Sequence, residues 1–443
     1  MPQVLSVLSR LHGSHDLATM KRILPLLLLL AASATAQKLT KKEKEIIQAV
    51  GRNNAAALAL LERSVNINSG TLNIAGVKAN GDLLEPEFKK IGFDTRWISM
   101  PAEMKRAGHL FAERKGNKGK RLLLIGHLDT VFEPDGPLQS WTQINDTLAS
   151  GPGANDMKGG NIILLYALKA LHEAGVLNDT QIIVALHGDE EFGGDPETIS
   201  RRDIIEAAKR SDLALAFEGA TAFDAATVAR RGSSGWRLTT TGLRAHSSAV
   251  FRPSVGSGAI YEAARILTEF HNELQEQYLT YNPGMIVGGS MAEMKAGDGT
   301  ASGKSNIVAE TAIVNGDLRF ISEEQKNRTR EKMKAIVARN LPQTSAVITF
   351  EDGIPAMSPT PGNYALLEQL NVASQEMGLG PVKAWDPGQR GAGDIAYVSP
   401  YISGLDGLGA MGSGAHSLDE KINLKTFRDL TARAAVLMYR LTR

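Results

Sequence analysis

Short apolar runs that end in polar residues recur through the first half of the chain. Residues 121–127 (RLLLIGH), 181–191 (QIIVALHGDEE) and 213–219 (LALAFEG) have the length and the apolar character of buried strands. Residues 161–175 (NIILLYALKALHEAG) carry apolar side chains at helical spacing and stop at a glycine. Strands that alternate with helices predict a layered α/β domain.

The pattern changes after about residue 229. Residues 232–248 and 305–322 alternate like surface strands, whereas residues 255–274 have the spacing of an amphipathic helix. From about residue 351 the α/β pattern returns, and it ends in a helix over 424–441. We therefore predict an N-terminal segment, an α/β domain in two parts and a smaller inserted α+β domain, with these bounds: 1–37; 38–228 and 351–443; 229–350.

The N-terminal segment has the pattern of an export signal that starts at Met20. The stretch MKRILPLLLLLAASATAQ has a basic start, an apolar run and a small-residue exit at Ala34-Thr35-Ala36. The apolar run is too short to span a bilayer, which argues against a membrane anchor. We expect cleavage near Ala36, a periplasmic or secreted mature chain and no membrane partner after cleavage. Residues 1–19 then read as upstream sequence from an early start codon.

The amino-acid composition limits which substrates, partners and metal ligands can be expected. The chain has 443 residues, 43% of them hydrophobic, which is enough for a large core and more than one domain. Basic and acidic residues nearly balance at 49 and 48, so we expect a small substrate and no nucleic-acid partner. Because the chain has no cysteine, disulfides and thiolate metal sites are excluded, and histidine, aspartate and glutamate are left as strong metal ligands.

Residues with ligand chemistry gather where the predicted strands end. In open α/β sheets, ligands bind just beyond the carboxyl ends of the strands. Two glycine-flanked loops, GPGANDMKGG and SGAHSLDE, add one carboxylate and one imidazole. The candidates are His127, Asp129, Asp156, Glu190, Glu191, Glu218 and His416.

This inventory suits two divalent cations. One cation would take His127 and Glu218, the second Glu191 and His416, and the carboxylate of Asp156 would bridge them. Mixed nitrogen and oxygen ligands favour zinc, with cobalt or manganese as substitutes. A water molecule between the cations would lose a proton near neutral pH and become a nucleophile for a carbonyl carbon.

Two further carboxylates have predicted supporting roles. Asp129 can accept a hydrogen bond from the second ring nitrogen of His127 and so orient that ligand. Glu190, beside a ligand and a cation-bound water, is the natural general base that later gives the proton to a leaving amine.

Each candidate taken singly also has an ordinary structural explanation. Asp129 could open a turn, Asp156 could cap the following helix, and Glu190 and Glu191 could belong to a solvated acidic loop. His127, Glu218 and His416 could simply end strands or lie in polar loops. The prediction depends on the ordered set, because short motifs often arise by chance.

The ordered set resembles a known family. GHLDTVF, GPGANDMKGG, GDEEFGG, AFEGA and SGAHSLDE, in this order, are similar to the di-zinc exopeptidase and amidohydrolase family that includes carboxypeptidase G, aminoacylase, acetylornithine deacetylase and succinyl-diaminopimelate desuccinylase. The resemblance spans essentially the whole mature chain, and the ending GAHSLDEKI is most similar to the carboxypeptidase G branch. It implies a layered α/β zinc-exopeptidase catalytic domain with a mixed central sheet and two zinc ions per subunit. It also implies Glu190 as the general base, Asp129 as the residue that orients His127, and these metal ligands: His127, Asp156, Glu191, Glu218 and His416.

The resemblance also gives the inserted domain a role as a lid that commonly forms a homodimer. It implies that His246 in TGLRAHSS polarises the scissile carbonyl as an oxyanion donor, from its own or the partner subunit. Asn306 and Arg319 match lid positions that grip substrate. Gly391 to Asp394 match a glycine-rich substrate loop, beside which Arg390 is a second candidate clamp for a carboxylate. An exposed loop histidine and a structural ion pair on a strand remain the alternatives for His246 and Arg319.

The implied function is an exported, zinc-dependent, carboxypeptidase-type hydrolase that cleaves an amide next to a free carboxylate of a small peptide. An N-acyl amino acid amidohydrolase or dipeptidase with the same site is the alternative. A catalytically idle relative that binds peptides or serves a structural role is an alternative of another class. The intact Glu190 and ligand set argue against it.

Overall fold

The computed structural model describes residues 39–295 and 297–443. The predicted export signal and its cleavage near Ala36 lie outside these residues. Within the described ranges, no helix is both long enough and apolar enough to cross a membrane.

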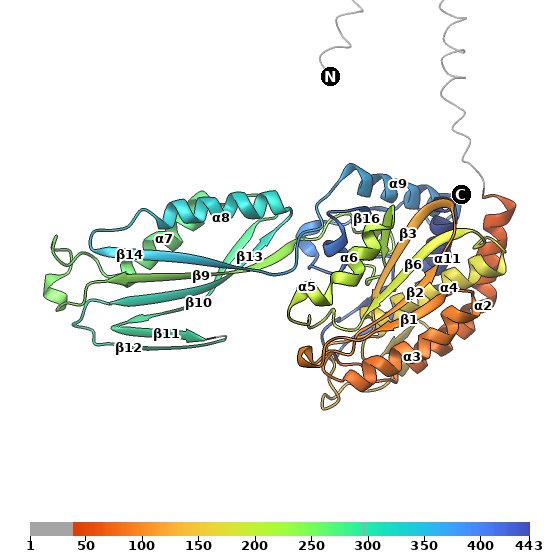
Figure 1. The fold of residues 1–443 in the computed structure, drawn as a ribbon, viewed down its shortest axis with the longest axis horizontal. Coiled ribbons are helices and arrows are strands. Elements are labelled where there is room, and N and C mark those ends of the chain that lie inside the picture. The colour runs from red at the N-terminus through yellow and green to blue at the C-terminus, as the bar shows by residue number, and fades with distance from the viewer. Residues whose placement is uncertain (1–38, 296) are drawn as a thin grey trace, which may run out of the picture. The chain divides into compact units, whose positions relative to one another are not determined.

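A mixed six-stranded sheet forms the centre of the α/β part (Figure 1). Its strands, in spatial order, are β1 (Asp94–Ile98), β2 (His109–Arg114), β6 (Thr180–His187), β3 (Lys118–His127), β7 (Leu213–Ala216) and β16 (Ser403–Leu405). The last four run parallel to one another, and β1 and β2 add an antiparallel edge. The predicted layered α/β fold with a mixed central sheet is therefore confirmed, and β3, β6 and β7 are the three predicted strands.

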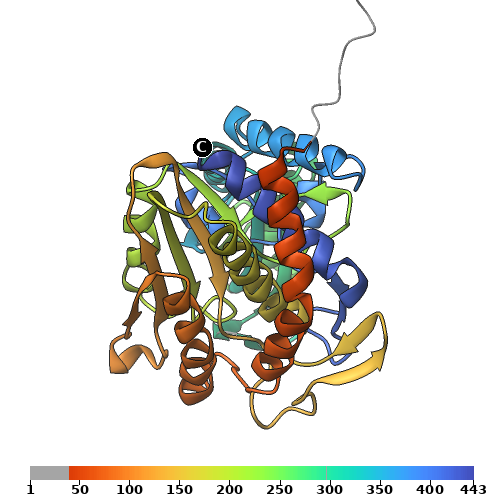
Figure 2. The ribbon, with the colours of Figure 1, turned by 90° about the vertical axis from the view of Figure 1, so that its right-hand side faces the viewer.

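Helices cover both faces of this sheet. Leu122 and Leu124 of β3 point to one face and join the core under α2, α4 and α11, whereas Leu123 and Ile125 point to the other and pack with α6 and α10. Both faces of a covered parallel strand must be apolar, which explains the unbroken run LLLI. Figure 2 shows α2 and α4 in front of the sheet. The helices of this part are α2 (Lys41–Val65), α3 (Ile74–Lys90), α4 (Gly159–Glu173), α5 (Glu197–Ser200), α6 (Arg202–Lys209), α9 (Pro361–Glu376), α10 (Ile395–Val398) and α11 (Leu424–Leu441).

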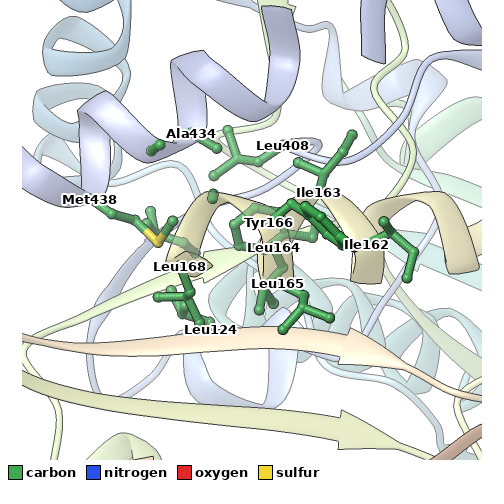
Figure 3. Close-up of a cluster of buried hydrophobic side chains, with 14 of the residues drawn as sticks. Leu124, Ile162, Ile163, Leu164, Leu165, Tyr166, Leu168, Leu408, Ala434 and Met438 are labelled. Carbon is green, nitrogen blue, oxygen red and sulfur yellow. The ribbon is translucent and has the colours of Figure 1, made fainter. Parts of the chain in front are cut away.

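Helix α4 is apolar around nearly its whole circumference. Its side chains lie between Leu124 of β3 on one side and Ala434 and Met438 of α11 on the other (Figure 3). A helix with neighbours on all sides has no polar face. Helix α4 is therefore packed into the core on all sides, and it begins directly after the segment that carries Asp156.

Residues 232–352 contain a second, antiparallel sheet. Its strands, in spatial order, are β10 (Thr280–Gly289), β13 (Thr311–Phe320), β9 (Gly232–Gly242) and β14 (Thr344–Asp352). Helices α7 (Ala259–Glu273) and α8 (Glu323–Val337) share a separate core with it, around Trp236, Phe270 and Val314. The strands and the helix predicted in this region are β9, β13 and α7. The proposed domain limits at residues 229 and 350 stay a prediction.

Small sheets complete the fold. Strands β17 (Gly412–Ser413), β18 (Lys421–Asn423), β5 (Leu148–Ser150) and β4 (Thr142–Asn145) pair in that order. In this sheet β5, which precedes Asp156 in the chain, pairs with β18, which follows His416. The remaining pairs are β8 (Ala225–Ala226) with β15 (Lys383–Ala384), and the hairpin of β11 (Met291–Lys295) and β12 (Asp298–Ser302).

Replacing Leu165, which is fully buried in α4, with alanine removes apolar contacts and leaves a cavity. We expect the free energy of unfolding to fall by about 2–5 kcal/mol. Urea denaturation followed by circular dichroism measures the change. Ile144→Ala is the control, because Ile144 is 46% exposed. Equal effects of the two substitutions would contradict the central place of α4 in the core.

Candidate metal centre

Three parallel strands bring most of the predicted residues to one edge of the central sheet. His127 ends β3 and lies opposite His187, the last residue of β6, so Glu190 and Glu191 follow just beyond it. Ile125 pairs with Ala216 of β7, which puts Glu218 level with His127. The carboxyl ends of parallel strands in an open α/β sheet are the usual place for a ligand site.

The five predicted ligands meet in two groups that share Asp156. His127 Nε2 lies 3.4 Å from Asp156 Oδ1 and 3.6 Å from Glu218 Oε1. His416 Nε2 lies 3.2 Å from Asp156 Oδ2 and 3.0 Å from Glu191 Oε2. The two oxygens of one carboxylate therefore face two different sets of side chains, and within each set the ligand atoms lie within 4.8 Å of one another.

These groups fit divalent cations. Ligand atoms about 2.0 Å from a tetrahedral zinc ion lie about 3.3 Å from one another, close to the separations found here. His127 Nε2 and Glu191 Oε1 are buried and have no hydrogen-bond partner among the described residues. Buried polar atoms rarely lack a partner, and a bound cation would supply one for each of these two atoms. The structure thus brings the predicted ligands together, and their individual roles stay a prediction.

The electrostatics of the group favour added positive charge. Burial, together with the nearby Glu218 carboxylate, raises the pKa of Glu190 well above its usual range. Burial and Asp156 raise the pKa of Glu218 to about 7. Hydrogen bonds with Asp156 and Glu191 raise the pKa of His416 to about 11, and although burial opposes a charged His127, Asp129 and Asp156 raise its pKa as well. The carboxylates therefore favour a bound cation or proton.

Asp129 connects the His127 end of β3 to the Glu190–Glu191 turn. Its carboxylate accepts hydrogen bonds from the backbone N–H groups of Glu190 and Glu191, both at 3.1 Å, and from the hydroxyl of Thr71 at 2.7 Å. His127 Nδ1 lies 3.1 Å from the main-chain oxygen of Asp129 and 3.4 Å from its carboxylate. The main-chain oxygen of Asp129, and not the predicted carboxylate, is thus the nearer partner of the ring. Sequence reasoning missed Thr71, which comes from a loop without a motif.

A cavity of about 220 Å³ is lined by Glu190 and by four of the five predicted ligands, Asp156, Glu191, Glu218 and His416. Arg390, Gly391 and Arg230 also line it. Arg390 Nη2 donates to the main-chain oxygen of Gly219 at 3.0 Å. Arg230 Nη1 donates to the main-chain oxygens of Gly391 and Ala392, and its Nη2 lies 3.9 Å from Glu218 Oε2. Arg390 and Gly391 therefore lie at the cavity as expected, whereas Arg230 was not predicted, because nothing in VARRGSS marks it.

The three predicted lid residues lie in the part with the antiparallel sheet. His246 Nδ1 is 2.9 Å from Ser248 Oγ, and the main-chain oxygen of Asn306 accepts from Ser247 N at 2.8 Å, so His246 and Asn306 are neighbours. Arg319 Nε donates to the Asp317 carboxylate at 2.8 Å. In the described ranges, no hydrogen bond or ion pair joins these three side chains to the five predicted ligands. Arg319 thus has the ion pair of the structural alternative, and its role as a clamp stays a prediction.

A third group of ligand-type side chains has a different explanation. His109, His187 and Asp189 are buried side by side, and the two imidazole rings stack at 4.3 Å. Arg201 Nη1 lies 2.6 Å from Asp189 Oδ1, and its Nε lies 2.9 Å from Asp394 Oδ1. The Arg201 guanidinium thus pairs with both carboxylates, and His187 Nδ1 lies 2.7 Å from the other oxygen of Asp394. The network ties the Glu190 turn to the predicted substrate loop that ends at Asp394.

Comparison with known proteins gives a consistent picture. The model of peptidase family M20/M25/M40 matches residues 123–440. Carboxypeptidase G2 of a Pseudomonas species is 29% identical over 394 residues, which cover 87% of this chain and 88% of that protein. Succinyl-diaminopimelate desuccinylase of Psychrobacter arcticus is 25% identical, with coverage of 83% and 89%. Aminopeptidase PepT of Bacillus cereus has a similar structure, with a TM-score of 0.70, 17% identity, and coverage of 88% and 99%.

Replacing Thr71 with valine keeps the shape of the side chain but removes the hydroxyl that holds Asp129. We expect zinc affinity to fall about 10-fold, because residues that orient ligands typically contribute this much. Competition with a chromophoric chelator measures it. Thr71→Ser, which retains the hydroxyl, should stay close to the original affinity. Loss of affinity in both variants, or in neither, would show that the Thr71–Asp129 hydrogen bond does not support the site.

Proposed function

Because the chain belongs to peptidase family M20/M25/M40 and is therefore a metal-dependent peptidase or amidohydrolase, we propose that it is an exported enzyme of carboxypeptidase type. It would cleave an amide or peptide bond next to a free C-terminal carboxylate in a small substrate. The observation that carries this proposal is the shared Asp156 carboxylate, which faces two ligand groups beside the half-buried Glu190. The similarity to carboxypeptidase G2 supports the type of reaction.

In this proposal His127, Asp156 and Glu218 hold one divalent cation, and Asp156, Glu191 and His416 hold a second, with zinc the best match to these ligands. When bound, such a pair supplies Lewis acidity and makes water acidic enough to lose a proton near neutral pH. Glu190 accepts that proton on a carboxylate oxygen while the water oxygen forms a bond to the carbonyl carbon. As the carbon–nitrogen bond breaks, Glu190 returns the proton to the leaving nitrogen.

The chain offers five candidate residues for binding the substrate. Arg390 and the Gly391 loop line the cavity beside Glu190, where a guanidinium can pair with a carboxylate through two parallel hydrogen bonds. His246 would donate a hydrogen bond to the developing oxyanion, and the neighbouring Asn306 would help to grip the substrate. Arg319 would contribute a second cation once it exchanges Asp317 for the substrate.

A second candidate function is hydrolysis of N-acyl amino acids or dipeptides at the same site. The similarity to succinyl-diaminopimelate desuccinylase over most of the chain favours it. Both candidates share Glu190 and the ligand set and differ in the group on the acyl side of the bond. Export from the signal that begins at Met20, and a homodimer through the part that contains the antiparallel sheet, complete the proposal.

Glu190→Gln keeps the size of the side chain but removes the base. We expect turnover to fall by about 10²- to 10⁴-fold while two zinc ions remain bound. Stopped-time assays and inductively coupled plasma mass spectrometry of the same preparation measure the two quantities. Glu103→Gln, the same change on an exposed side chain, is the control. Retained turnover in Glu190→Gln would remove its role as the base.

The reaction itself is tested with residues 38–443 loaded with zinc and offered dipeptides, N-acyl amino acids and folate-like glutamyl amides. Amino acids released are detected by mass spectrometry, with the Glu190→Gln variant run in parallel. We expect release from substrates with a free carboxylate and much less from their amidated forms. Preference for N-acyl amino acids would select the second candidate, and no release from any compound would contradict both.

A further inference from the structure

Glu420 has a carboxylate in an unusual position. Its side chain is fully buried, only four residues after His416. Its Oε1 accepts hydrogen bonds from the backbone N–H groups of Asn155 and Asp156 at 2.8 and 2.9 Å, and its Oε2 accepts from that of Gly153 at 3.1 Å. Three main-chain donors of the segment that carries Asp156 therefore converge on this one carboxylate.

The backbone of that segment explains why it needs such an acceptor. Asp156 and Met157 have non-helical torsion angles (φ −118°, ψ 95° and φ −130°, ψ 36°), although α4 begins at Gly159, only two residues after Met157. The N–H groups of Gly153, Asn155 and Asp156 lie at the start of this segment, where no preceding helical turn supplies carbonyl partners, and a buried N–H without an acceptor is costly. A carboxylate has two oxygens and only accepts, so it can satisfy all three.

The segment that carries Glu420 is itself fixed at both ends. Before it, Ser417 N donates to Gly414 O at 2.9 Å, which closes the turn around His416. At Glu420 itself, the main-chain oxygen accepts from Ser150 Oγ at 2.7 Å, and Lys421 begins the pairing of β18 with β5. His416 reaches the side chain of Asp156 while Glu420 holds its main chain, so one short segment contacts Asp156 from two directions.

We propose that Glu420 is a positioning residue that sets the place of the Asp156 carboxylate between the two ligand groups. This inference rests on the proposed function, in which Asp156 is the ligand that both cations share. Glu420 contacts the main chain of Asp156 and acts through it. Because Asp156 belongs to both groups, a shift of its backbone disturbs both cation sites at once.

The test compares two changes of the same kind on adjacent residues of the full chain. Glu420→Gln keeps the size of the side chain but leaves one accepting oxygen and adds an N–H₂ group that faces backbone donors. Asp419→Asn is the matched control, because the Asp419 side chain is 90% exposed. Both are stripped of metal and titrated with zinc against a chromophoric chelator, and thermal unfolding of the metal-free proteins is recorded beside this.

We expect Glu420→Gln to bind both zinc ions about 10- to 100-fold more weakly, as is typical when a residue that orients a ligand is lost, and Asp419→Asn to bind like the original. Glu420→Asp, which keeps the charge but shortens the reach, should recover part of the affinity. A lower melting temperature with unchanged zinc affinity would mean that Glu420 supports only the fold, and would overturn the proposal.

Two further outcomes separate this proposal from the proposed function. If the unaltered chain binds fewer than two zinc ions, the shared Asp156 site fails, and with it the role of Glu420. If it binds two ions and Glu420→Gln binds them equally well, only the inference about Glu420 fails. Should Glu420→Gln not fold, Glu420→Asp carries the test, and zinc affinity equal to that of the original would overturn the proposal.

Discussion

The accumulation of negative charge at one sheet edge is the constraint on which the site depends. Asp156, Glu190, Glu191 and Glu218 meet in a largely buried space, where carboxylates repel one another and lose hydration. Each must be balanced by a proton, a guanidinium or a cation. The Arg230 guanidinium near Glu218 supplies part of this balance, and the two ligand groups around Asp156 provide places for the rest.

The rest of the α/β part holds these charges in place. The Asp129 carboxylate fixes the Glu190–Glu191 turn through its two N–H groups, and Arg201 links that turn to the loop that ends at Asp394. Helix α4, whose side chains are packed into the apolar core, follows the segment that carries Asp156 and anchors its C-terminal end. Side chains that would repel one another in solution are held close because backbone donors and neighbouring guanidinium groups leave them little freedom to separate.

The sequence predicts the elements whose signal is local and periodic. Strands β3, β6 and β7 are predicted from their apolar runs, because a strand buried on both faces needs apolar residues throughout. Helices α4 and α11 are predicted from the spacing of their apolar residues, because burial of a helix face dictates residue type at helical intervals. The ligand set is readable because each member follows a strand or lies in a glycine-flanked loop. Thr71, Arg230 and Glu420 are not, because their roles come from contacts with residues far away in the chain. Glu420 and Asp419 are adjacent and chemically alike, and only the fold buries one and exposes the other.

The two ligand groups differ in their access to water. The side chain of His127 is 1% exposed, whereas that of His416 is 57% exposed and lies on a loop residue with a φ of +62°. An ion held by His416 and Glu191 would therefore lie nearer to solvent on the side of its histidine than an ion held by His127 and Glu218. The two positions should exchange their ions at different rates. Removal of the ions by a chelator would then pass through a form of the protein that keeps a single ion, at the position of His127 and Glu218.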